Sequence, residues 1–287
     1  KWELVASSGP SGRHSTSMAF DGTGVVLFGG ARGQGDSLLA DTWRWDGAAW
    51  SKLDAFPSPR STFGHTLLAA KNAEVWMLLG RSNDDTAFSW DGSSWAPKLG
   101  GNPTNRTTAA AFDSDRGVVV ALDLDTTDRT LRHWEYDGTT WKSVAVVTPP
   151  ERRGARMVYD TFRKRVVLFG GRELQNDTWE YGSGAWSKRS PATSPSSRHG
   201  FCMAYDPSRR LTVLFGGGEG GNTLVGSETW EYDGETWRRG PDGPPTRRSC
   251  AMTYDPKKGR IMMFGGVYPV SGDGGFWNGA RDDTWLY

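Results

Sequence analysis

A tryptophan that recurs at a nearly fixed interval is the feature that most constrains how this chain can fold. After a D-G-x-x turn or its equivalent stand Trp50, Trp95, Trp141, Trp186 and Trp237, spaced 45 to 51 residues apart. A period near 50 residues is typical of stacked supersecondary units rather than of separate domains. The sequence therefore predicts a single repeat domain over residues 1–287.

Each unit contains four short segments that read as strands A to D. In the fourth unit they are M-V-Y-D at 157–160, V-V-L-F-G-G at 166–171, T-W-E-Y at 178–181 and W-S-K-R at 186–189. Several are apolar without alternation, as expected where neighbouring sheets bury both faces of a strand. Because no stretch carries a helical period, we expect an all-β fold with four antiparallel strands in each unit.

The two ends of the chain complete one another. Residues 284–287, T-W-L-Y, form a strand C with no strand D after it, and residues 1–4, K-W-E-L, form a strand D with nothing before it. The N-terminal strand is therefore expected to complete the last unit. This arrangement gives a closed six-bladed β-propeller that leaves no open sheet edge at the seam.

The repeated motifs resemble those of the kelch-repeat β-propeller family. The resemblance rests on F-G-G at 28–30, 169–171, 215–217 and 264–266 and on T-W-E-Y-D-G-x-x-W at 229–237. It implies a six-bladed kelch-type β-propeller and, since such propellers mostly serve as rigid platforms, a non-catalytic binding or scaffolding role. The second and third repeats depart from the pattern at Leu79-Gly80 and Ala121-Leu122-Asp123, where local irregularity is expected.

The net charge and the placement of the loops limit which classes of binding partner we expect. Lys and Arg total 34 against 33 Asp and Glu, and no apolar run is long enough to span a bilayer, so neither nucleic acid nor a membrane is expected. The B–C loops and D–A links share one end of the propeller and carry the length variation, as in the long segment 267–281. Since irregular loops on a rigid scaffold usually carry function, we expect a protein, a peptide or a small anionic ligand at this end.

An arginine recurs at the start of each strand A and predicts an anion-binding rim around the mouth of the pore. Its guanidinium group suits carboxylates and phosphates. An alternative interpretation is that these arginines are structural and bridge neighbouring blades, for example by pairing with the acidic residue before Thr-Trp, such as Asp41 or Asp283. The candidate rim, completed by two histidines and three off-pattern aromatic residues, comprises Arg13, His14, Arg60, Arg106, Arg152, Arg198, His199, Arg247, Tyr268, Phe276 and Trp277.

Signatures of catalysis and of metal or cofactor binding are missing. Galactose-oxidase-like kelch propellers hold copper with tyrosines and histidines, whereas only Tyr268 here lies outside the repeat positions. The iron motif of nitrile-specifier kelch proteins would need a histidine where Tyr181 stands. We therefore expect no cofactor, no metal and no catalytic residue. Two alternatives stay open, an enzyme acting on a small sugar-like molecule in the same pocket and a structural module of a larger assembly.

The only two cysteines, Cys202 and Cys250, lie in equivalent A strands with an offset of one residue. Because strand side chains alternate between faces, the two thiols are expected to point to opposite sides. The sequence therefore predicts no disulfide.

Overall fold

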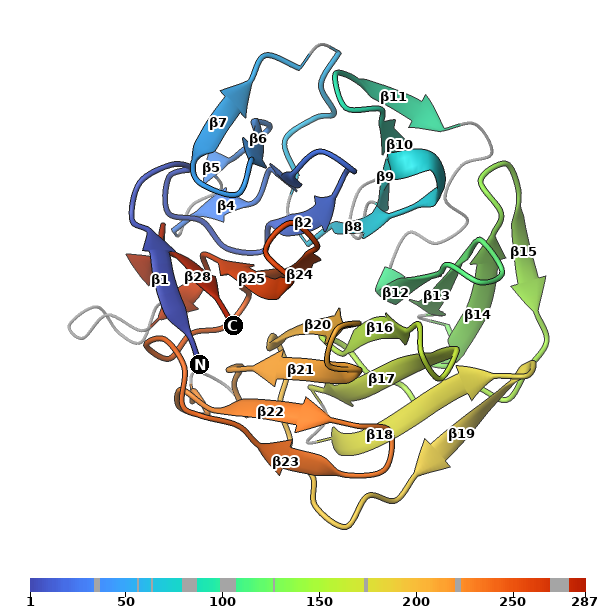
Figure 1. Ribbon diagram of the computed structural model, residues 1–287. Coiled ribbons are helices and arrows are strands. Elements are labelled where there is room, and N and C mark those ends of the chain that lie inside the picture. The colour runs from blue at the N-terminus through green and yellow to red at the C-terminus, as the bar shows by residue number, and fades with distance from the viewer. Residues whose placement is uncertain are drawn as a thin grey trace.

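The computed structural model shows six four-stranded antiparallel sheets arranged as blades around a central axis (Figure 1). It describes residues 1–33, 37–55, 57–62, 64–78, 87–98, 107–125, 127–172, 175–219, 223–268 and 279–287. The predicted all-β, six-bladed propeller is confirmed. In the described part of the chain, no helix is long and apolar enough to cross a membrane.

Each blade runs from its innermost strand A to its outermost strand D. Blade 1 is β2 (Ser17–Phe20), β3 (Val25–Phe28), β6 (Thr42–Trp45) and β7 (Trp50–Leu53). Blade 2 is β8 (Thr66–Ala69), β9 (Val75–Leu78), β10 (Ala87–Trp90) and β11 (Trp95–Lys98). Blade 3 is β12 (Thr107–Asp113), β13 (Val118–Leu124), β14 (Leu131–Tyr136) and β15 (Trp141–Val144).

The other three blades follow the same order. Blade 4 is β16 (Arg156–Asp160), β17 (Arg165–Gly171), β18 (Gln175–Gly182) and β19 (Ala185–Arg189). Blade 5 is β20 (Cys202–Asp206), β21 (Leu211–Phe215), β22 (Thr229–Tyr232) and β23 (Trp237–Arg239). Blade 6 is β24 (Ala251–Asp255), β25 (Arg260–Phe264), β28 (Thr284–Leu286) and β1 (Glu3–Ala6). Short elements in the connections are β4 (Ala31–Arg32), β5 (Ser37–Leu38), β26 (Val267–Tyr268), β27 (Gly279–Ala280) and the 3-10 turn η1 (Lys71–Ala73).

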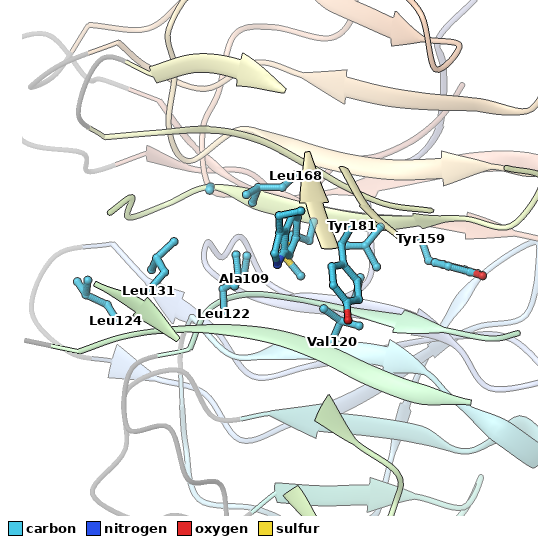
Figure 2. Close-up of a cluster of buried hydrophobic side chains, with 13 residues drawn as sticks. Ala109, Val120, Leu122, Leu124, Leu131, Tyr159, Leu168 and Tyr181 are labelled. Carbon is cyan, nitrogen blue, oxygen red and sulfur yellow. The ribbon is translucent and has the colours of Figure 1, made fainter. Parts of the chain in front are cut away.

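The hydrophobic core is divided among the interfaces between blades. The B strands β3, β9 and β25 are buried over almost their whole length because a neighbouring blade covers each of their faces. Figure 2 shows the interface of blades 3 and 4, where Leu122 and Val120 pack with Leu168 and Tyr181. Apolar runs without alternation therefore correspond to strands buried on both faces, as the sequence predicts.

In five of the six blades, the recurrent tryptophan of strand D joins the blade to the one before it. Its indole Nε1 donates a hydrogen bond to a side chain at the start of strand C in the preceding blade. These bonds are 2.8–3.0 Å long and run from Trp50 to Thr284, Trp95 to Thr42, Trp186 to His133, Trp237 to Thr178 and Trp2 to Thr229. The tryptophan thus recurs in the sequence because it makes a contact between neighbouring blades.

The N-terminal strand closes the ring, as predicted. Strand β1 pairs antiparallel with β28, so blade 6 takes its outermost strand from the start of the chain and its other three from the end (Figure 1). Trp2 is 7% exposed and packs against Phe215 and Tyr287. Closure therefore combines backbone pairing with burial of an aromatic residue.

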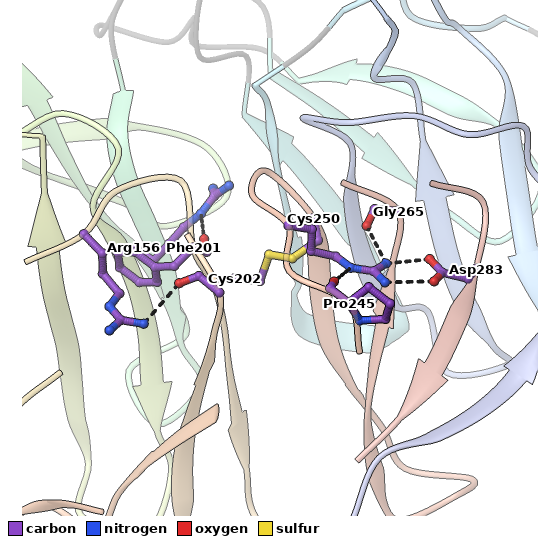
Figure 3. Close-up of a disulfide and its surroundings, with 10 residues drawn as sticks. Arg156, Phe201, Cys202, Pro245, Cys250, Gly265 and Asp283 are labelled. Carbon is purple, nitrogen blue, oxygen red and sulfur yellow. Dashed lines mark hydrogen bonds and ion pairs between the residues drawn. A yellow bond between two sulfur atoms is a disulfide. The ribbon is translucent and has the colours of Figure 1, made fainter. Parts of the chain in front are cut away.

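The prediction for the cysteines is wrong, because Cys202 and Cys250 form a disulfide with their Cα atoms 5.8 Å apart (Figure 3). The two side chains do point to opposite faces of their own blades. However, blades 5 and 6 are neighbours, and in a propeller one face of a blade packs against the opposite face of the next blade. An offset of one residue is therefore what this cross-link between β20 and the residue just before β24 requires.

Blade 3 lacks the Gly-Gly pair that follows strand B in most other blades, yet its strands B and C pair in regular register. Without a Gly-Gly pair, β13 continues to Leu124 and stays paired with β14, with Asp123 opposite Arg132 and Leu124 opposite Leu131. The departure at Ala121-Leu122-Asp123 therefore lengthens the sheet. Leu79 and Gly80 of blade 2 lie outside the described residues.

Candidate functional site

Four of the recurrent arginines lie inside the blades, each paired with an acid of its own blade. Arg13, Arg152, Arg198 and Arg247 are at most 1% exposed. Arg13 is representative, since its two Nη atoms bond both carboxylate oxygens of Asp41 at 2.6 and 2.9 Å and its Nη1 bonds the carbonyl of Gly29 at 3.0 Å. Arg152 and Arg247 likewise bond both carboxylate oxygens of Asp177 and Asp283, whereas Arg198 bonds one oxygen of Glu228 at 2.8 Å. We call these four residues the strut arginines.

In the pairs formed by the strut arginines, the guanidinium group stabilises the charged form of the carboxylate. Burial by itself would raise the pKa of Asp41, but hydrogen bonds from Arg13 and Trp43 outweigh burial and lower that pKa below its ordinary value. The pKa of Asp283 is lowered in the same manner by Arg247 and Trp285. Figure 3 shows the Asp283 carboxylate, with Gly265 and Pro245, around one guanidinium group. This geometry matches the structural interpretation of the recurrent arginine, although each pair lies within a blade and does not join two blades.

Blade 2 has no arginine in the strut position. In three other blades the carbonyl of a strut arginine accepts a bond from the second glycine of the preceding Gly-Gly pair, as from Gly266 to Arg13. The corresponding bond from Gly30 goes to the carbonyl of Thr62 at 2.9 Å, so Thr62 holds this position. Arg60 lies two residues earlier and is exposed. Arg106, predicted for blade 3, lies outside the described residues.

The remaining candidates are spread over the end of the propeller formed by the B–C and D–A connections, which we call the loop face. His14 and His199 each follow a strut arginine and bridge to the B–C segment, at Ala31 and Gly218. Burial, together with Arg172 and Arg248, lowers the pKa of His199 to about 4, so this ring is neutral at physiological pH. The ring of Tyr268 stacks under the guanidinium of Arg281. Phe276 and Trp277 lie outside the described residues.

The central channel contains a cavity of about 320 Å³, within the range of small-molecule sites. All six innermost strands contribute to its wall, and half of the residues along it are alanine, methionine, valine or leucine. Arg156 is the one charged side chain among the described residues that line it. None of the strut arginines, His14 or His199 is part of this wall.

Arg156, which sequence reasoning missed, opens strand β16 and differs from every strut arginine. Its Nε donates to the carbonyl of Phe201 in blade 5 at 3.3 Å, and no described carboxylate pairs with it. Burial lowers the pKa of this guanidinium, yet an arginine so placed keeps its charge at neutral pH. Arg156 therefore presents a partly desolvated positive charge to the cavity.

A signal for Arg156 does exist in the sequence. It lies four residues after the strut arginine of its blade, where blades 1, 5 and 6 have Ser17, Cys202 and Ala251. Ser17 accepts a hydrogen bond from the backbone of Leu67 in the next blade, and Cys202 forms the disulfide to the next blade. A charged residue at a position that otherwise holds small residues stands out once the repeats are aligned on the strut.

A ring of backbone hydrogen bonds lies on the loop-face side of the cavity. It joins one residue from each of five blades, two positions after the strut, and each of these has a positive φ between 52° and 70°. Four of the N–H groups, those of Gly64, Ser15, Ser249 and Gly200, donate to the carbonyl of the equivalent residue in the blade before, with lengths of 2.6–3.3 Å. We call these residues the collar; they are Gly64, Ser15, Ser249, Gly200 and Gly154. The left-handed backbone turns their polar groups along the ring and away from the blade, which explains why glycine and serine stand there.

Comparison with known proteins supports the fold alone. The solved structure of YjhT is similar to this chain with a TM-score of 0.74 and 15% sequence identity, over 98% of this chain and 96% of that one. No family model and no curated protein matches the sequence. The six-bladed propeller is therefore shared with a solved structure, whereas the likeness to the kelch family is a resemblance of sequence motifs alone.

Proposed function

We propose that this chain is a binding module that holds a small anionic molecule in its central channel, with Arg156 as the charged contact. The observation that carries the proposal is that the strut arginines are all ion-paired, whereas Arg156 faces a cavity and meets no described carboxylate. A charge desolvated in this way is costly unless an opposite charge approaches it. A carboxylate in the channel would supply that charge and form short, charge-assisted hydrogen bonds.

The composition of the channel wall favours binding over catalysis. The described residues along it include no aspartate, glutamate or histidine, and its two cysteines are joined in the disulfide. General acid–base catalysis most often uses a histidine or a carboxylate within hydrogen-bond reach of the substrate, and the wall offers neither among its described residues. Arg156 is always protonated, so it can orient and neutralise an anion but cannot exchange a proton with it.

Benzoate and its neutral analogue benzamide test the proposal by titration calorimetry. We expect the wild type to prefer benzoate, and Arg156→Met to weaken benzoate binding roughly 10- to 100-fold, since a hydrogen bond to a charged group contributes about 1.5–3 kcal/mol. Arg172→Met is the matched control, because Arg172 is exposed on the loop face and lies outside the cavity wall. Equal binding of the two probes, or unchanged benzoate affinity in Arg156→Met, would contradict the proposal.

A further inference from the structure

The cavity extends in one direction from Arg156. On the loop-face side its wall starts at Thr16 and Cys250, three residues after the strut, and no collar residue belongs to it. In the other direction the wall reaches Ser114, Thr161 and Pro207, which lie in the A–B turns. We call this opposite end of the propeller, formed by the A–B and C–D turns, the turn face. The described wall therefore runs from just below the collar to the turn face.

The collar narrows the loop-face end of the channel. Neighbouring chains joined laterally by backbone bonds lie about 4.8 Å apart, so a six-membered collar would measure about 9 Å between opposite backbones. Van der Waals contact distances of about 3.5–4 Å leave little more than half of that width open. Among the described residues, four consecutive bonds join the five collar residues, and blade 3 contributes no collar bond. An aromatic or branched molecule would pass this ring poorly.

Aromatic side chains line the turn-face end of the cavity. Tyr159, Tyr205 and Tyr254 occupy the same register in blades 4, 5 and 6, three residues further along strand A than Arg156. Two of the rings are fixed by their hydroxyl groups. Tyr159 donates to Asp115 at 2.8 Å, and Tyr205 accepts from the backbone N–H of Phe162 at 3.4 Å. Fixed aromatic rings offer contact area at little cost in conformational entropy.

We infer that the ligand enters through the turn face and is an elongated monoanion, with its carboxylate at Arg156 and an apolar or aromatic body between the three tyrosines. This inference rests on the function proposed above. Three residues of strand separate the two sites by about 10 Å, which sets the length of the ligand. Between them the wall carries Met157, Met203 and Met252, whose flexible thioethers adapt to an apolar body. Tyr159, Tyr205 and Tyr254 are thus the specificity-determining residues.

A series of ω-phenylalkanoates tests the ligand class. From benzoate to 5-phenylpentanoate we expect affinity to rise at least about tenfold, because the added methylene groups become buried and the ring reaches the tyrosines. Tyr254→Ala should remove most of this gain and lower the affinity for 5-phenylpentanoate far more than that for benzoate, whereas Tyr254→Phe should retain the gain. An affinity that depends on Arg156 but not on chain length or on Tyr254 would overturn this inference and leave the proposed function standing. Loss of all carboxylate binding would remove both.

Thiol labelling tests the entrance without disturbing the tyrosines. Both native cysteines are in the disulfide, so an introduced cysteine is the only free thiol. Thr161→Cys places it at the turn-face end of the cavity, and Arg172→Cys places it on the loop face; both native side chains are exposed. After reaction with a polyethylene-glycol maleimide, the association rate of 5-phenylpentanoate should fall at least roughly tenfold in the first variant and stay unchanged in the second. The reverse result would place the entrance at the loop face.

Discussion

The seam between blades 5 and 6 and the seam between blades 2 and 3 are built from the same repeat but are joined differently. The first carries the disulfide, the bond from Trp2 to Thr229, and a bond from the Tyr287 hydroxyl to Glu231 at 3.0 Å. Across the second, no hydrogen bond or ion pair joins the described residues of the two blades. It is packed by Trp76, Tyr136 and their apolar neighbours.

A single substitution explains part of this contrast. Blade 2 has Ala87 where the other blades have a threonine or, in blade 3, His133. The indole Nε1 of Trp141, which should donate to that residue, is buried without a partner among the described residues. Blade 2 also has Thr62 in place of a strut arginine. The comparison teaches that apolar packing alone can hold two neighbouring blades together. The hydrogen bonds and ion pairs of the repeat can therefore be absent from one blade without loss of the fold.

The largest effect is expected from a strut arginine. Arg247→Met should lower the free energy of unfolding by about 3 kcal/mol or more, because the partly buried Asp283 carboxylate loses its fully buried partner. The double variant Arg247→Met/Asp283→Leu should recover much of that loss. Arg60→Met in blade 2, at an exposed position outside the strut register, should change stability by less than about 1 kcal/mol, because interactions of exposed charges contribute little. Urea denaturation measures all three, and equal effects of Arg247→Met and Arg60→Met would remove the distinction between the blades.

The disulfide should contribute somewhat less to the free energy of unfolding than the Arg247–Asp283 pair does. Replacing Cys202 and Cys250 with serine is expected to lower stability by about 2–4 kcal/mol, since the bond closes a loop with a sequence separation of 48 residues. Thiol titration of the unreduced, unfolded wild type should find no free thiol. Two free thiols per chain, or a denaturation midpoint unchanged by the double substitution, would show that the seam between blades 5 and 6 does not depend on this bond.

Matched tryptophan substitutions compare the two kinds of seam directly. Trp237→Phe removes the donor to Thr178 and leaves a buried hydroxyl unsatisfied, whereas Trp141→Phe removes an indole N–H that has no described partner. Both changes delete the same atoms. Trp237→Phe should therefore cost about 1–3 kcal/mol more than Trp141→Phe. A larger loss in Trp141→Phe would mean that its indole is satisfied in solution.

Restoring the missing acceptor should have the smallest effect, with the opposite sign. Ala87→Thr offers a hydroxyl to Trp141 at the position that threonine holds in four other blades, and threonine suits a strand. We expect a gain of about 0.5–1.5 kcal/mol. The gain should disappear in the Ala87→Thr/Trp141→Phe double variant. A gain that persists there would come from strand propensity and not from the restored bond.

The sequence predicts what the repeat imposes and misses what occurs once. The strand order, the closure by residues 1–4 and the structural alternative for Arg13 and Arg247 all follow from recurrence at a fixed period. Arg60 misleads because an arginine near the strut looks equivalent until backbone bonds identify Thr62 as its counterpart. The disulfide was missed because faces were compared within a blade, although the contact lies between blades.

Arg156 could not be assigned from recurrence, because one charged residue in one blade carries no period. Its significance comes from three-dimensional placement, at the wall of a channel that all six innermost strands share. The entrance of the channel also could not be predicted from the sequence. Variable loops predict function at the loop face, whereas the described cavity wall extends toward the short A–B turns.

Thermal denaturation of the wild type, Arg156→Met and Arg247→Met, each with and without benzoate, tests most directly which arginines hold the fold and which one faces a ligand. We predict that Arg156→Met melts near the wild-type temperature and gains nothing from benzoate, whereas the wild type gains up to about 2.7 kcal/mol at a concentration 100 times its Kd. Arg247→Met should melt well below both and still be stabilised by benzoate. If Arg156→Met melts as low as Arg247→Met, or gains as much from benzoate as the wild type, Arg156 is not the ligand contact.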